Sequence, residues 1–357
     1  RRASMSDAPP DSRVRISTEP GPKRTLKQTI VALTWPVVVG QVLANIVPLI
    51  DLLMLRKHGT LTLAAVGYAA QFLMLTQATL IALGAACVAM MARAIGARDP
   101  DLARRSFAAN LWLALGVTGT TLLITWVFPE QLLHLLAVDE SVIHLAVPYL
   151  RLTLTAAPLM AISLTFESAF RAARDTFRPM LIVSLIACIK VFANMVLLSG
   201  LFGFPDLGLT GAAYSTLISQ LAGCVLFIGA SRAHGHSTVR LSLRDLWVPS
   251  ATLREAFALA WPAVAERFAM NAATLFYFRF LGGYGVQAVA AYNVGVRILA
   301  FTWIPGVGLS VAAATLVGQA LGAGDPDQAR RAVQVAQRLA ASIAVSLGVL
   351  FIALRIP

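Results

Sequence analysis

Nine long apolar segments constrain this chain more than any other feature of its sequence. Each has the length of a helix that crosses the hydrocarbon core of a bilayer, which takes about 20 apolar residues. The alternation over about ten residues that is typical of barrel strands is missing, so helices are the structure that satisfies the backbone in lipid. The sequence therefore predicts an all-α, polytopic membrane protein with spans at about 30–55, 64–95, 106–128, 141–169, 179–201, 208–231, 256–281, 290–321 and 332–354.

The distribution of basic residues predicts how these spans are oriented. The net charge of +12 would suggest nucleic-acid binding in a soluble protein, but this chain is 58% hydrophobic and only 13% charged. Of its 29 Lys and Arg residues, 20 lie in the N-terminal tail and the even-numbered loops, whereas the odd-numbered loops contribute only Arg56 and Lys57. Because basic loops stay in the cytoplasm, we expect a cytoplasmic N-terminus, a bacterial inner (plasma) membrane location and no nucleic-acid partner.

An internal repeat predicts the domain organisation. Trp35-Pro36 recurs as Trp261-Pro262, Ala64-Ala65 as Ala290-Ala291, and RDPDLARR (98–105) as GDPDQARR (324–331), always at an offset of 226 residues. One copy covers six helices, an even number, so the two copies are parallel, as in transporters that rock two bundles about a central site. We expect a disordered cytoplasmic tail (1–27), a six-helix lobe (28–235), a cytoplasmic linker (236–255) and three helices of a second lobe (256–357).

Three long motifs resemble the multidrug and toxic compound extrusion (MATE) family. They are FESAFRAARDTFRPM (166–180), LFGFPDLGLTGAA (201–213) and GLSVAAATLVGQALGAGDPDQARR (308–331). The resemblance implies two six-helix lobes forming a V, and antiport of drugs or metabolites against protons or sodium. Since the second copy stops after its third helix, the chain resembles a family member truncated after the ninth helix.

Polar residues within the first and fifth spans form the main candidate site, because an ionisable side chain inside a membrane is costly and needs a function or a partner. Asn45, Pro48 and Asp51 follow one another at three-residue steps, and Lys190 and Asn194 share a helix face. The resemblance implies that Asp51 binds a proton or sodium and that Asn194 stands where the family has Asp or Asn. Lys190 departs from the family pattern. Helix rise places the Lys190 side chain within reach of Asp51, which favours protons over sodium as the coupling ion.

A second group of candidates lies outside those two spans. Glu266 follows Pro262 by four residues and matches a glutamate found in one branch of the family, although Arg267 beside it leaves a structural charge cluster as the alternative. Gln71 and Arg297 occupy equivalent positions of the repeat, which suggests that both line a cavity. These residues complete the predicted ion- and substrate-binding set.

The remaining chemistry of the sequence predicts no enzyme, cofactor or metal site. Nucleophile elbows, phosphate loops and dinucleotide fingerprints are missing, and the three cysteines lie singly in apolar runs. We expect a monomeric exporter of small, cationic or amphiphilic drugs or metabolites. A flippase for lipid-linked oligosaccharides of the same superfamily is the alternative within transport, and a non-transporting membrane scaffold is the alternative outside it.

Overall fold

The computed structural model describes residues 25–136, 140–199, 207–233, 238–241, 243–282 and 286–353. Nearly all of them are helical and none of them forms a strand, which confirms the all-α prediction. Residues 1–24 of the predicted tail lie outside the described residues. The elements are α1 (Leu26–Leu55), η1 (Arg56–His58), α2 (Thr60–Gly96), α3 (Pro100–Val127), α4 (Pro129–Leu135), α5 (Glu140–Thr155), α6 (Ala157–Ala172), α7 (Phe177–Ser199), α8 (Gly208–Ala233), η3 (Leu243–Leu246), α9 (Ser250–Gly282), α10 (Val286–Gly322) and α11 (Pro326–Ala353).

Eight helical segments in the described part of the chain are long and apolar enough to cross a membrane. The predicted fourth span consists of two helices, α5 and α6, that are joined at Ala156, because Pro158 in the first turn of α6 has no N–H to continue the α5 ladder. The seventh predicted span is α9, which is long enough but less apolar, since Glu266, Arg267 and Asn271 interrupt its hydrophobic run. Length and hydropathy together therefore support eight of the nine predicted spans.

The repeated octapeptide forms the same helix-to-helix turn in both copies. In the first copy Arg98 has a positive φ of 57°, and in the second Gly324 has a φ of 74°. The aspartate that follows caps the next helix: the Asp99 carboxylate accepts a hydrogen bond of 2.9 Å from the Leu102 N–H, and Asp325 accepts one of 2.8 Å from the Gln328 N–H. Positive φ, capping Asp and Pro at the first helical position thus explain why this motif recurs.

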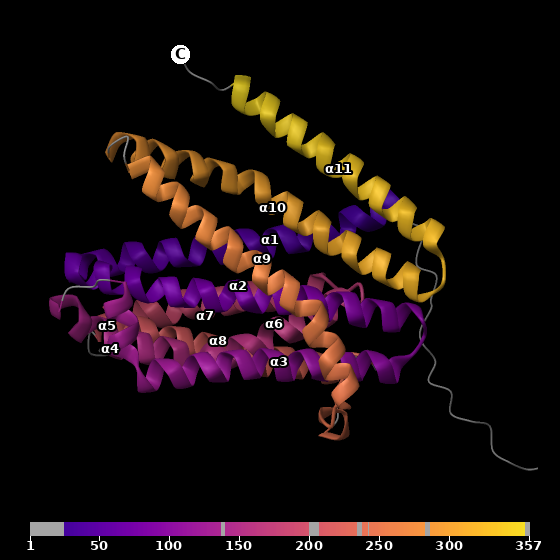
Figure 1. Cartoon of the computed structure of the whole chain (residues 1–357), viewed down its shortest axis with the longest axis horizontal. Coiled ribbons are helices and arrows are strands. Elements are labelled where there is room, and N and C mark those ends of the chain that lie inside the picture. Colours follow the sequence, from indigo (N-terminus) through magenta and orange to yellow (C-terminus); the bar gives the residue numbers. More distant parts are fainter. Residues whose placement is uncertain are drawn as a thin grey trace, which may run out of the picture.

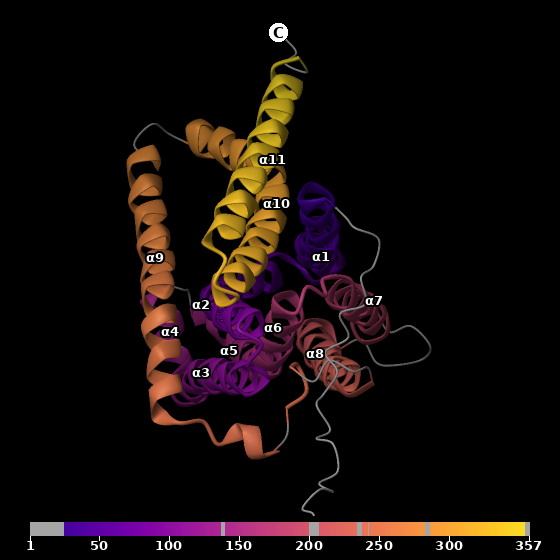
Figure 2. The same ribbon diagram turned by 90° about the vertical axis from the view of Figure 1, so that its right-hand side faces the viewer.

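Helices α1 to α8 run side by side as one bundle, while α10 and α11 lie near it where α10 ends and α11 begins and diverge from it toward their opposite ends (Figure 1). Helix α9 packs on α2 and α3, and α10 packs on α1, α2 and α11. The end view in Figure 2 places α9 along one side of the bundle and α7 with α8 on the other. We call the end at which α2 and α10 finish and α3 and α11 begin the basic end, because it carries Arg93, Arg98, Arg104, Arg105, Arg330 and Arg331.

Small residues let α2 and α10 cross closely at the basic end. A Cβ added to Gly318 would meet Ala92 at 2.8 Å, and one added to Gly322 or Gly96 would collide with backbone of the opposite helix. With an offset of 226, Gly318 corresponds to Ala92 and Gly322 to Gly96, so the two copies of the repeat contact each other through equivalent residues. The amide of Gln319 extends this contact by donating a hydrogen bond of 2.7 Å to the Ala172 carbonyl of α6.

Candidate functional site

An ion pair joins the end of α1 to the middle of α7. The Lys190 Nζ atom lies 3.1 Å from Asp51 Oδ2, and the two side chains are 12% and 22% exposed. Figure 2 shows α7 next to α1 and α8. Asp51 lies one turn before Leu55, where α1 ends and η1 begins. The contact expected from helix rise is confirmed, whereas the transport role of the pair remains a prediction.

Asn194 holds the second carboxylate oxygen of Asp51. Its side-chain amide donates a hydrogen bond of 2.5 Å to Asp51 Oδ1 and accepts one from the Ser215 hydroxyl of α8. Both Asn194 and Ser215 are fully buried. Because both carboxylate oxygens and both ends of the amide have partners, the charge of Asp51 is compensated although water is largely excluded.

Helix α8 completes the environment of the lysine. The Lys190 ammonium donates to Thr216 Oγ1 at 2.8 Å and to Ser215 Oγ at 3.4 Å. Lys190 and Asn194 are one turn apart on α7, and α8 packs closely along that helix. The hydroxyls of Ser215 and Thr216 on α8 therefore face these two polar side chains. We call Asp51, Lys190, Asn194, Ser215 and Thr216 the Asp51 cluster.

Apolar packing holds these helices in register on one side of the cluster. The buried core there contains Leu55 of α1, Leu198 of α7 and Ala212 of α8, together with Tyr149 of α5. Tyr149 also interacts electrostatically with Asp51. Such a packed wall keeps the dielectric low, which strengthens the attraction between Asp51 and Lys190.

Ser215, Thr216 and Tyr149 were not predicted from the sequence. The two hydroxyls also bond to the Ala212 carbonyl of their own helix, as serines and threonines in apolar helices commonly do, so nothing in their local pattern distinguishes them. Only the pairing of α7 with α8 brings them to Lys190. Comparing the depths in the membrane of polar residues on consecutive spans could have identified these two hydroxyl residues as candidate partners.

The other predicted site residues whose side chains are described are not hydrogen-bond or ion-pair partners of the Asp51 cluster. Asn45 is exposed and its amide donates to the Gln41 carbonyl one turn earlier at 2.7 Å, while α1 continues as a helix through Pro48. Gln71 is exposed on α2, and Glu266 is exposed on α9, a helix that packs on α2 and α3. The helical backbone of Arg297 belongs to α10, but its side chain lies outside the described residues. The predicted set thus includes members of the Asp51 cluster and further residues on α1, α2, α9 and α10.

The Asp51 cluster contains a single acid whose charge can change. Asp51 is its only carboxylate, and within the described residues no group of three or more His, Cys, Asp or Glu side chains could hold a metal ion. Protonation of Asp51 would remove the charge that attracts Lys190 and would leave the ammonium with its two hydroxyl partners. The cluster can therefore exist in two charge states that require different contacts between α1 and α7.

Comparison with known families and proteins gives consistent matches. The MatE family model matches residues 36–196 and 262–357, which is more than half of the chain. A probable multidrug resistance protein NorM of Thermotoga maritima is 25% identical over 330 residues, covering 91% of this chain and 70% of that protein. A protein named FAD transporter from Shewanella oneidensis is 26% identical over 290 residues, covering 80% of this chain and 63% of that protein. The chain thus spans about two thirds of the length of these relatives.

Solved structures share the fold. The crystal structure of MATE in the bent conformation superposes with a TM-score of 0.83 at 23% identity, covering 90% of this chain and 71% of the other. The outward-facing conformation of a multidrug resistance MATE family transporter of the MOP superfamily gives a TM-score of 0.81 at 23% identity over 91% and 72% of the two chains. The described helices therefore have the arrangement seen in those proteins.

Proposed function

The chain belongs to the MatE family of multi-pass membrane transporters, and on this premise we propose that it is a secondary antiporter that exports small cationic or amphiphilic molecules in exchange for protons. The Asp51 cluster is the observation that carries this proposal. An ion pair inside a membrane-spanning bundle contributes little to stability compared with apolar packing, so its presence points to a function.

The contacts of Asp51 favour protons over sodium. A sodium ion would need oxygen ligands, but Lys190 lies against Asp51 Oδ2 and the Asn194 amide donates to Oδ1. The ammonium would also repel a second cation at the same place. A proton needs no such space, because it adds directly to one carboxylate oxygen and weakens the attraction for Lys190.

The relative placement of the lobes supports alternating access with a cytoplasmic basic end. The buried contacts of α10 and α11 with α1 involve Ile30, Leu309 and Ala332, which lie in the halves of their helices nearer the basic end. The ribbons diverge toward the other end (Figure 1). Such an arrangement is expected of a transporter whose site opens away from its closed, basic side. Protonation of Asp51, by changing the contacts between α1 and α7, would bias the exchange between this state and its opposite.

Transport by purified protein in liposomes tests the proposal. A pH gradient without sodium should drive movement of the cationic dye ethidium, and Asp51→Asn should reduce that movement to the level of empty liposomes. FAD serves as the comparison substrate, since one relative bears that name. Movement that follows a sodium gradient and ignores pH would overturn proton coupling, while pH-driven movement of FAD without ethidium would overturn the proposed substrate class.

A further inference from the structure

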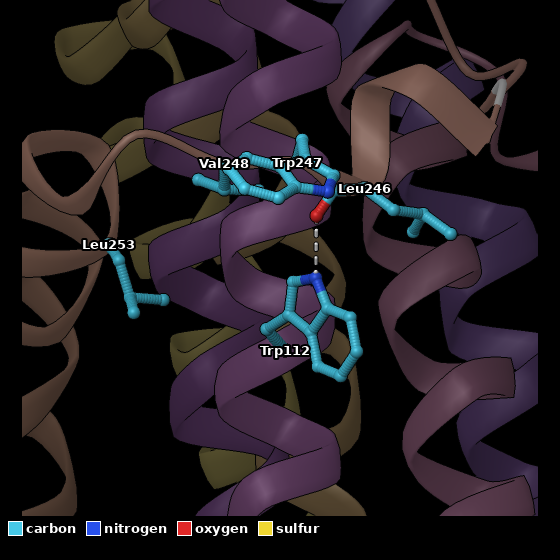
Figure 3. Close-up of a pocket in the computed structure, with 5 residues that line it drawn as sticks. All are labelled: Trp112, Leu246, Trp247, Val248 and Leu253. Carbon is cyan, nitrogen blue, oxygen red and sulfur yellow. Dashed lines mark hydrogen bonds between the residues drawn. The ribbon is translucent and has the colours of Figure 1, made fainter.

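A second feature of the structure lies outside the Asp51 cluster, where the chain between the lobes returns to the bundle. Leu246, Trp247 and Val248 pass over α3 and, with Trp112 of α3 and Leu253 of α9, line an open groove of about 300 Å³. Figure 3 shows the Trp112 indole beneath the Leu246 carbonyl, with the Trp247 ring beside it and Leu253 across the groove. The side chains that line this groove are apolar or aromatic, and the Leu246 carbonyl adds a polar group.

The position of Trp112 along α3 places the groove where the charged start of the helix gives way to its apolar part. Arg104 and Arg105 lie in the second turn of α3, and Trp112 follows Arg105 by seven residues, or about 10 Å of helix. The linker therefore extends past the arginines toward the apolar part of α3. Asp245 of the linker forms an ion pair of 3.6 Å with Arg104 Nε. Beyond this residue the linker runs along the apolar part of α3.

Two contacts fix the linker at this depth. The Trp112 Nε1–H donates a hydrogen bond of 2.9 Å to the Leu246 carbonyl, which satisfies a backbone group at the end of η3. Irregular backbone at membrane depth requires such partners because lipid offers none. Val248 packs against the buried Met90, Ala109 and Ala256, so the three helices α2, α3 and α9 hold it.

Trp247, between these two fixed residues, is 91% exposed. A tryptophan in this position would be unfavourable in water, whereas indole rings gather at membrane interfaces, where the apolar ring is buried and the N–H stays near polar groups. Trp112 is also half-exposed beside it, and the basic Arg254, next to acidic Glu255, is exposed one residue after Leu253. The apolar groove and the indole rings suit the acyl chain of a phospholipid, and the neighbouring arginine suits its phosphate.

We propose that residues 245–253 form an interfacial membrane anchor in which the groove holds a phospholipid acyl chain and Trp247 inserts at the boundary between headgroups and acyl chains. The linker then does more than join the lobes. It attaches the start of α9 to the membrane surface on the basic side. When α9 moves relative to α3, its start therefore stays at the level of that surface.

Depth-dependent fluorescence quenching tests this anchor in the full chain in phospholipid nanodiscs. Position 247 receives an environment-sensitive probe through Trp247→Cys in a Cys188→Ala background, because Cys188 is exposed while Cys87 and Cys224 are buried. The matched control is Asp327→Cys, an exposed position at the start of α11 on the same basic end. Quenchers are a phospholipid with a nitroxide near the top of its acyl chain, and iodide in the water.

The probe at 247 should be quenched at least about twofold more by the lipid nitroxide than the probe at 327, and less by iodide. Equal quenching at the two positions, or quenching at 247 by iodide alone, would overturn the proposal and would leave a protein or soluble ligand as the occupant. Since Trp247→Cys removes the ring itself, the unlabelled chain gives a second measurement. Brominated lipid should quench wild-type tryptophan fluorescence more than that of Trp247→Phe, and equal quenching would again overturn it.

Discussion

Helices α1 and α9 are equivalent in the repeat, yet they carry different chemistry. Both contain the Trp-Pro pair, and each packs against the second helix of the opposite copy: α1 on α10 and α9 on α2. At the offset of 226, however, Asp51 corresponds to Tyr277, and Glu266 corresponds to Gly40. Asp51 has partners on α7 and α8, whereas Glu266 is exposed. Duplication has kept the scaffold, but the acid that pairs with Lys190 on α1 is replaced by Tyr277 at the equivalent position of α9.

Replacing the two acids tests this difference most severely. We expect Asp51→Asn to lower pH-driven export of ethidium at least about tenfold, because the variant keeps the shape of the side chain but cannot change charge. Glu266→Gln should lower export less and leave its dependence on the pH gradient intact. Initial rates in liposomes at matched protein density measure both. Equal losses in the two variants would refute a proton site confined to the first lobe.

The partner of Asp51 should affect the pH profile more than the maximal rate. In Lys190→Met the Asp51 carboxylate loses the ammonium that attracts it in only one of its two charge states. We therefore expect the pH profile of export to move. Lys190→Arg, which keeps the charge, is the control and should stay closer to the wild type. An unmoved profile in Lys190→Met would show that the pair is not coupled to transport.

The α2–α10 crossing is a feature that the two copies share, so its substitutions should behave alike. Gly322→Leu and Gly96→Leu each place a side chain against backbone of the opposite helix and should destabilise the protein by about 1–3 kcal/mol. Gly116→Leu is the control, because nothing lies within 4 Å of a Cβ at that position. Thermal unfolding midpoints in detergent give the comparison. A destabilisation at Gly116 that matches the other two would contradict the close crossing.

The repeated turns should show the smallest and most symmetrical effects. Asp99→Ala and Asp325→Ala each remove a helix cap, which costs about 1 kcal/mol. The thermal midpoints of the two variants should fall by similar amounts, and replacement by Asn should restore most of the loss, since Asn caps helices equally well. A lower thermal midpoint in only one of the two variants would mean that the equivalent turns contribute unequally to stability.

Features set by local pattern were predictable from this sequence. Span length, the offset between the two Asp-Pro turns and the reach of Lys190 toward Asp51 follow from helix geometry and from the cost of charge in lipid. The partners on α8 were not predictable, because Ser215 and Thr216 look like ordinary hydroxyl residues until α7 and α8 are paired. Asn45 was predicted to share a face of α1 with Asp51, whereas in the structure it is exposed and its amide bonds within its own helix. Facing partners depend on tertiary packing, which a single sequence does not contain.

Proton release upon substrate binding tests the central claim most directly, because it reports the charge of Asp51 without requiring transport. Ethidium is added to purified protein in weakly buffered detergent solution, and a pH-sensitive dye counts the protons released. If substrate and proton compete through Asp51, wild-type protein should release up to about one proton per bound ethidium near the midpoint of the pH profile. Asp51→Asn should bind ethidium and release none. Wild-type binding without proton release, or equal release from Asp51→Asn, would contradict the assignment of Asp51 as the coupling site.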